Sequence, residues 1–154
     1  FLARARPQWQ FLLVGHAAVD VGALRALPNV RLAGAQPYAQ LAHWARAFDV
    51  AIIPYRMNRQ TANANPLKLR EYLATGKPVV SMRNPEIEKF AAHVHIADDH
   101  PGFLAALDAA LATDTPQAAR ARMASVADQS WDRRVADVLA EVENAMSAPQ
   151  IRNP

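Results

Sequence analysis

The residues best suited to chemistry lie within residues 65–76, NPLKLREYLATG. Asn65 is a good N-cap, Pro66 is a good first helical residue, and Gly76 is typical of the position that ends a helix. The free amides at the start of such a helix, together with the positive end of its dipole, attract anions. Lys68 opposes that dipole but adds positive charge at the same place. We therefore predict an anion site at the start of this helix.

Glu71 follows Lys68 by three residues, so both side chains lie on one face of the helix. Leu69 and Leu73 lie four residues apart on another face and predict the packing surface. Lys68 and Glu71 are then expected to face the ligand crevice. The alternative is an exposed ion pair that contributes well under ~1 kcal/mol and binds nothing.

The elements that must position these residues alternate along the chain. Five short apolar runs, punctuated by Gly or Pro, are typical of strands buried in a parallel sheet. They alternate with helical patterns, which predicts an α/β, doubly wound fold followed by a helical C-terminal tail. The runs are residues 10–15, 30–34, 49–54, 78–82 and 93–97, and the helical patterns are residues 20–27, 38–48, 66–75, 85–92, 99–112, 116–127 and 131–146.

In an open α/β sheet, ligands bind at the carboxyl ends of the strands. The loops expected there are residues 15–20, 34–38, 54–65 and 82–85. The loop of residues 54–65 is the longest and is polar, which favours a functional role. His16 follows Gly15 at the end of the first run and is a candidate for ligand contact.

Composition excludes several classes of function. The net charge is +3, but the Arg residues are mostly scattered singly, which does not favour a nucleic-acid binder. The absence of Cys excludes disulfides and thiolate nucleophiles. His93 and His95 alone do not make a zinc site, so no metal is predicted. No apolar run approaches the ~20 residues that span a bilayer. One domain is predicted over residues 1–146, with a frayed tail at residues 147–154.

The pattern N-P-L-K-L-x-E-Y-L-A-x-G-K-P-V-V, together with the order of the strands, resembles a known family over about residues 8–146. It is similar to the C-terminal, donor-binding domain of GT-B glycosyltransferases, close to the retaining family 4 (group 1) enzymes. The resemblance implies a Rossmann-like domain that is half of a GT-B fold. It also implies transfer of a sugar from a nucleotide diphosphate sugar to an acceptor hydroxyl, in polysaccharide or glycoconjugate synthesis.

The same resemblance assigns roles to residues. Glu71 would hold the ribose hydroxyls of the nucleotide, and Tyr38 would stack on the base. Lys68 would be catalytic, because it stabilises the diphosphate leaving group, without a metal or cofactor. Asn63 stands where the family has a first Glu; its amide can bond a sugar hydroxyl but carries no charge. The diphosphate and sugar would lie against the loop and helix start formed by Asn65, Pro66, Leu67 and Lys68.

Other expectations concern the longer protein. The family's first strand and glycine loop do not precede Phe1, so we expect a fragment that is inactive alone. That strand is central in the family, and its absence would leave the sheet split. The expected partners are the donor, a glycan or lipid-linked glycan acceptor, and an N-terminal acceptor domain in cis. The expected location is the cytoplasm, with peripheral contact to the inner membrane face.

Two other functions remain open. A sugar-nucleotide epimerase of GT-B architecture would share the donor-site helix. A non-catalytic α/β nucleotide-binding module is also compatible with Asn63. A receiver domain is disfavoured, because Asp49 begins its strand and Lys77 precedes its strand.

Overall fold

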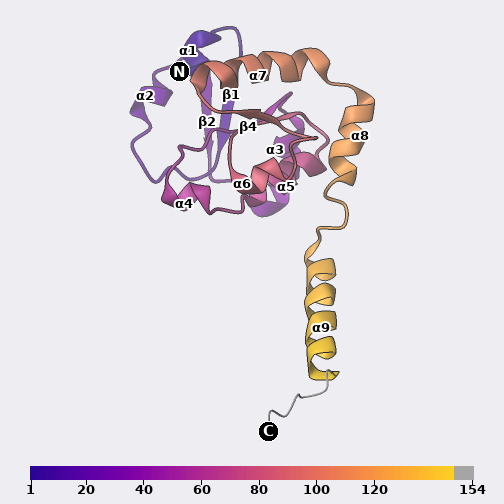
Figure 1. The fold of residues 1–154 in the computed structure, drawn as a ribbon. Coiled ribbons are helices and arrows are strands. Elements are labelled where there is room, and N and C mark those ends of the chain that lie inside the picture. The colour runs from indigo at the N-terminus through magenta and orange to yellow at the C-terminus, as the bar shows by residue number, and fades with distance from the viewer. Residues whose placement is uncertain (148–154) are drawn as a thin grey trace.

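A computed structural model of the chain describes residues 1–147 (Figure 1). The predicted tail falls almost wholly on residues 148–154, which lie outside the described residues; Ser147 belongs to the last helix. The α/β prediction is confirmed. The described strands are β1 (Phe11–Val14), β2 (Val30–Gly34), β3 (Ala51–Ile53), β4 (Val79–Met82) and β5 (His95–Ala97).

The strands form two sheets rather than one continuous sheet. β1 pairs with β2, and β4 lies between β3 and β5. All the pairings are parallel, with Ala51 opposite Val79 and Val80 opposite His95. A divided sheet is what the family resemblance led us to expect.

The helices follow the predicted alternation, with shorter bounds. Prediction missed α4, a single turn inside the loop of residues 54–65, which is closed by reciprocal bonds between Asn58 and Thr61, both of 2.9 Å. The helical elements are α1 (Leu2–Ala5), α2 (Gly22–Arg25), the 3-10 turn η1 (Tyr38–Gln40), α3 (Leu41–Arg46), α4 (Arg59–Ala62), α5 (Leu67–Ala74), α6 (Pro85–Glu88), α7 (His100–Thr113), α8 (Pro116–Ala124) and α9 (Trp131–Ser147).

Two apolar clusters cover opposite faces of the three-stranded sheet. On one face Leu69 and Leu73 of α5 are fully buried against Val79, as their spacing predicts. On the other face Phe103 of α7 packs against Val80. Successive residues of a strand point to opposite faces, so β4 joins the two clusters. In Figure 1, α7 accordingly lies across the sheet from α5 and α6.

The last helix does not join either cluster. α9 extends away from the sheets (Figure 1), and none of its residues is buried. Trp131, at the start of this helix, is 75% exposed. Within residues 1–147, no helix is both long enough and apolar enough to cross a membrane.

Candidate functional site

The candidate site is built on the start of α5. The helix begins at Leu67, and the residue at its N-cap is Pro66, which has no side chain that could cap it. The predicted cap by Asn65 is therefore wrong. Its Oδ1 instead accepts a hydrogen bond of 2.5 Å from Arg70 Nη1, because a charged donor makes a stronger bond than a neutral backbone amide. Within residues 1–147 the amides of Leu67 and Lys68 have no acceptor, so they remain available to an anion.

Lys68 and Glu71 form an ion pair on the exposed face of α5. Lys68 Nζ lies 2.8 Å from Glu71 Oε2, and the side chains are 51% and 41% exposed. The hydrogen bond to Glu71 is the main cause that raises the pKa of Lys68, and partial burial opposes it. The Lys68 amine is therefore charged at neutral pH. The pair is accessible, so a ligand can replace it at a cost of less than ~1 kcal/mol.

Tyr38 connects a second loop to this face. It begins η1 directly after the loop that follows β2, and 82% of its surface is exposed. Its hydroxyl is close enough to Lys68 to contribute, weakly, to the raised pKa of that amine. The loop that leaves β3 leads directly into α5, whereas within the described residues the loop that leaves β2 is related to α5 only through this weak influence of Tyr38 on Lys68; β2 and β3 belong to different sheets.

The remaining predicted residues have mixed positions. Leu67 is 63% exposed beside Lys68, whereas Pro66 is buried and offers only its backbone. Asn63 donates from Nδ2 to the carbonyl of Arg59 at 2.7 Å, so its amide is engaged within α4. His16 is exposed in the loop after β1, and no hydrogen bond or ion pair joins it to α5 within the described part of the chain.

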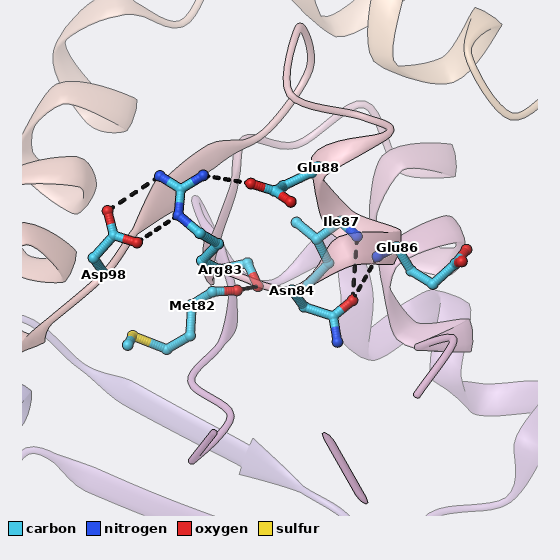
Figure 2. A network of polar contacts seen from close by, with 8 residues as sticks. Met82, Arg83, Asn84, Glu86, Ile87, Glu88 and Asp98 are labelled. Carbon is cyan, nitrogen blue, oxygen red and sulfur yellow. Dashed lines mark hydrogen bonds and ion pairs between the residues drawn. The ribbon is translucent and has the colours of Figure 1, made fainter. Parts of the chain in front are cut away.

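Sequence reasoning missed Asn84, the residue that fastens the loop before α5. Asn84 is 1% exposed. Its Oδ1 accepts from the amides of Glu86 and Ile87 at 2.8 and 3.3 Å, so it caps α6 (Figure 2). Its Nδ2 donates to the carbonyl of Thr61 at 2.5 Å. The Asn-Pro pair at residues 84–85 was the available signal, because Asn is a preferred N-cap and Pro a preferred first residue.

Arg83 joins the end of β4 to α6 and to the segment after β5. Its guanidinium lies between Asp98, at 2.5 Å from Nε, and Glu88, at 2.6 Å from Nη1 (Figure 2). The hydrogen bond to Asp98 is the main cause that raises the pKa of Arg83, and the same bond lowers the pKa of Asp98. Two carboxylates balance this cation, so Arg83 holds loops together and is poorly placed to bind an anion.

The site contains no built metal centre. In residues 1–147 no group of three or more His, Asp or Glu side chains is arranged to hold an ion. His95 lies on β5, whereas His93 precedes that strand, although the sequence predicted one strand over residues 93–97. Burial and the charge of Arg122 lower the pKa of His95.

Comparison with known proteins places the chain in a family. The family model described as "Glycosyl transferases group 1" matches residues 2–120, which include every candidate site residue. The putative teichuronic acid biosynthesis glycosyltransferase TuaH of Bacillus subtilis (strain 168) is 32% identical over 139 residues, and the alignment covers 84% of this chain and 35% of that protein. The chain therefore spans about a third of the length of this relative. The exposed Lys68–Glu71 face of α5 lies inside the matched region, and the chain belongs to the group 1 family of glycosyl transferases.

Proposed function

We propose that this chain forms the donor-binding part of a glycosyltransferase and binds a nucleotide diphosphate sugar across the start of α5. One observation carries the proposal: at the start of α5, two backbone amides without an acceptor in the described residues lie beside an accessible cation–carboxylate pair, Lys68 and Glu71. This helix start follows the loop that leaves β3, and ligands of open α/β sheets bind at the carboxyl ends of the strands.

The diphosphate would bind at the helix start. The amides of Leu67 and Lys68 supply two donors, the helix dipole favours negative charge, and the Lys68 ammonium adds a full positive charge. Charge grows on the diphosphate as its bond to the sugar breaks. Fixed donors directed at that charge lower the barrier, because they need no rearrangement during the reaction. Lys68 would thus be the catalytic group on this chain.

The ribose would bind one turn further along the helix. A carboxylate accepts hydrogen bonds from two neighbouring hydroxyls, and dinucleotide-binding folds use one for this purpose. Glu71 is 41% exposed in its side chain and is the acidic group nearest to the anion site on α5. On binding, its bond to Lys68 would give way to bonds with the ribose, while Lys68 turns to the diphosphate.

The base and the sugar would lie on either side of this pair. Tyr38 presents an exposed ring for stacking on the base. Asn63 would need to leave its bond with the Arg59 carbonyl before it could bond a sugar hydroxyl. That requirement suggests that the loop of residues 54–65 rearranges when the sugar binds.

The acceptor belongs to the wider enzyme. The relative's name refers to teichuronic acid biosynthesis, and we propose by analogy that this protein also acts in the synthesis of a polysaccharide or glycoconjugate. An acceptor domain in cis would bring the accepting hydroxyl to the donor, and contact with the inner membrane face would bring a lipid-linked acceptor within reach.

The test separates the diphosphate from the nucleoside. We expect the complete enzyme to bind UDP- or GDP-linked sugars in calorimetry. Lys68→Ala should weaken binding of the matching nucleoside diphosphate by about tenfold or more, the size expected for one charge-assisted contact, and leave nucleoside binding nearly unchanged. Arg46→Ala, which removes an exposed cation on α3, should alter neither. Equal losses for diphosphate and nucleoside would remove the phosphate role of Lys68.

A further inference from the structure

A polar cavity lies on a different side of α5 from the proposed donor face. Its volume is about 650 Å³, within the usual range of small-molecule sites. Arg70 contributes to it; at 3.6 residues per turn Arg70 is rotated by about 100° from Glu71 and about 200° from Lys68. Neither Lys68 nor Glu71 lines it. The lining residues are Asn65, Arg70, Glu86, Lys89, Phe90, His93, Ser125, Gln129 and Arg134.

Arg70 is fixed in this cavity by neutral partners. Its Nε donates to Gln129 Oε1 at 2.6 Å, and its Nη1 donates to Asn65 Oδ1 at 2.5 Å. The guanidinium also lies over the ring of Phe90, with 5.5 Å between its central carbon and the ring centroid. These contacts hold the guanidinium in place without neutralising it. Within residues 1–147 these are the two hydrogen bonds that the guanidinium donates, so three of its five N–H donors, two of them on Nη2, remain for a ligand.

The other charges of the cavity are also mainly positive. Lys89 pairs with Glu86 at 2.5 Å, and Glu86 is the one carboxylate among the lining residues. Arg134 contributes a further cation from α9 and forms no ion pair within the described residues. The lining therefore carries two positive charges in excess when His93 is neutral. Ser125 and Gln129 add polar groups that suit hydroxyls.

We propose that this cavity is a second anion site, which binds a phosphate or carboxylate group of a small polar ligand between Arg70 and Arg134. A guanidinium matches both groups because it can donate two parallel hydrogen bonds. The cavity shares α5 with the donor face but none of its charged residues, so this proposal does not depend on the donor assignment.

The experiment follows the Arg70 side chain directly. In the complete protein labelled with ¹⁵N-arginine, the Nε–H resonance of Arg70, assigned with Arg70→Lys, is titrated with inorganic phosphate and separately with acetate. We expect a saturable shift with at least one of them. A saturable shift with phosphate alone would indicate a site for phosphorylated ligands. A saturable shift with both anions would indicate a site that also accepts carboxylates.

Three variants give the decision. Arg134→Gln should weaken the titration by about fivefold or more, as loss of one charge-assisted contact implies. Arg120→Gln, which removes an exposed cation on α8, should leave it unchanged, and so should Lys68→Ala. The proposal is overturned if neither anion gives a saturable shift. It is also overturned if Lys68→Ala abolishes the shift, since the anion would then bind at the donor face.

Discussion

At the scale of single residues, Lys68 and Glu71 explain how one exposed ion pair can serve as a site. The ion pair contributes almost nothing to the free energy of unfolding, because both side chains are solvated. Such a weak ion pair suits a binding site, because its two partners can separate at little cost and bind different parts of a ligand. The structural and the functional interpretations of the pair are thus compatible: it is a weak salt bridge without a ligand, and under the proposed function Lys68 would bind the diphosphate while Glu71 binds the ribose.

Arg122 shows the opposite case, a cation that stabilises the fold. Its side chain is 7% exposed, its Nε donates to the carbonyl of Gly76 at 2.9 Å, and its Nη2 pairs with Asp114. Arg122→Ala should lower the free energy of unfolding by about 2–4 kcal/mol, because it leaves a helix-end carbonyl and a carboxylate without their partner. Urea titration is the measurement. Arg120→Ala is the control and should change stability by less than about 0.5 kcal/mol; equal effects of both variants would contradict this role.

His95 should make the fold sensitive to mild acid. Its pKa lies below the ordinary value of 6.5, chiefly because burial disfavours the charged form. The unfolded chain therefore binds a proton that the folded chain resists, so stability is lost as the pH falls from 6.5 toward the lower folded pKa. Between pH 7 and pH 5, His95→Gln should show a smaller loss of unfolding free energy than the wild type. A loss of the same size in both proteins would argue against this cause.

At the scale of elements, the start of α5 depends on contacts that are distant in the sequence. Asn84 joins α6 to the segment before α5. Its side chain caps α6, and it also donates a hydrogen bond to the carbonyl of Thr61 in that segment. These bonds fix the position of the loop of residues 54–65, and this loop leads into the start of α5, where the donor face is proposed. A site on a loop needs such support to keep its geometry.

Asn84→Ala should therefore act on both elements. We expect a loss of about 2 kcal/mol in unfolding free energy, from the missing cap and the unsatisfied carbonyl. We also expect faster amide hydrogen exchange in residues 58–65. Thr115→Ala removes the cap of α8, where the hydroxyl accepts from the Ala118 amide at 3.1 Å, and should cost about 1 kcal/mol without changing that exchange. Unchanged amide hydrogen exchange of residues 58–65 in Asn84→Ala would show that Asn84 does not hold this loop.

The elements were predictable to different degrees from the sequence, for physical reasons. Leu69 and Leu73 were found because helical spacing alone defines a buried face. The cap of α5 was misassigned because Asn65-Pro66 gives the same local signal whether the amide caps the helix or binds Arg70, five residues later. The turn α4 was missed because side-chain bonds between Asn58 and Thr61 maintain it, rather than apolar periodicity.

The relation between Tyr38 and Lys68 was not visible in any local pattern. The sequence places Tyr38 after one strand and Lys68 after another, and strand order decides how near they lie. The family resemblance supplied an expected order; in the structure Tyr38 contributes weakly to the raised pKa of Lys68, and its role in stacking on the base stays a prediction. Asn84, by contrast, had a clear capping signal, but its bond across 23 residues to Thr61 had none.

At the scale of the whole molecule, two features stand out in the described residues. The strands divide into two sheets, and α9 exposes one apolar face. That face comprises Trp131, Val135, Val138, Leu139, Val142 and Met146, each between 49% and 82% exposed.

The exposure of the apolar face of α9 has a direct consequence for the free energy of unfolding. In the 154-residue chain, Val138→Gln and Leu139→Gln should each change the free energy of unfolding of the two-sheet body by less than about 0.5 kcal/mol. Leu73→Ala is the matched control: Leu73 is fully buried, so its truncation should cost about 2–5 kcal/mol. Urea unfolding followed by Trp9 and Trp44 fluorescence gives both values. A loss above about 1 kcal/mol in either α9 variant would mean that this helix packs on the body.

The most direct test of the central claim is the affinity of the complete enzyme for its nucleoside diphosphate, measured by calorimetry with wild type and Glu71→Ala. If Glu71 holds the ribose, the variant should bind the nucleotide more than about tenfold more weakly, as expected when a carboxylate with two charge-assisted hydrogen bonds is removed. The 2′,3′-dideoxy nucleotide, which lacks both hydroxyls, should bind wild type and variant with similar affinity. Equal affinity of wild type and Glu71→Ala for the ribonucleotide would contradict the account.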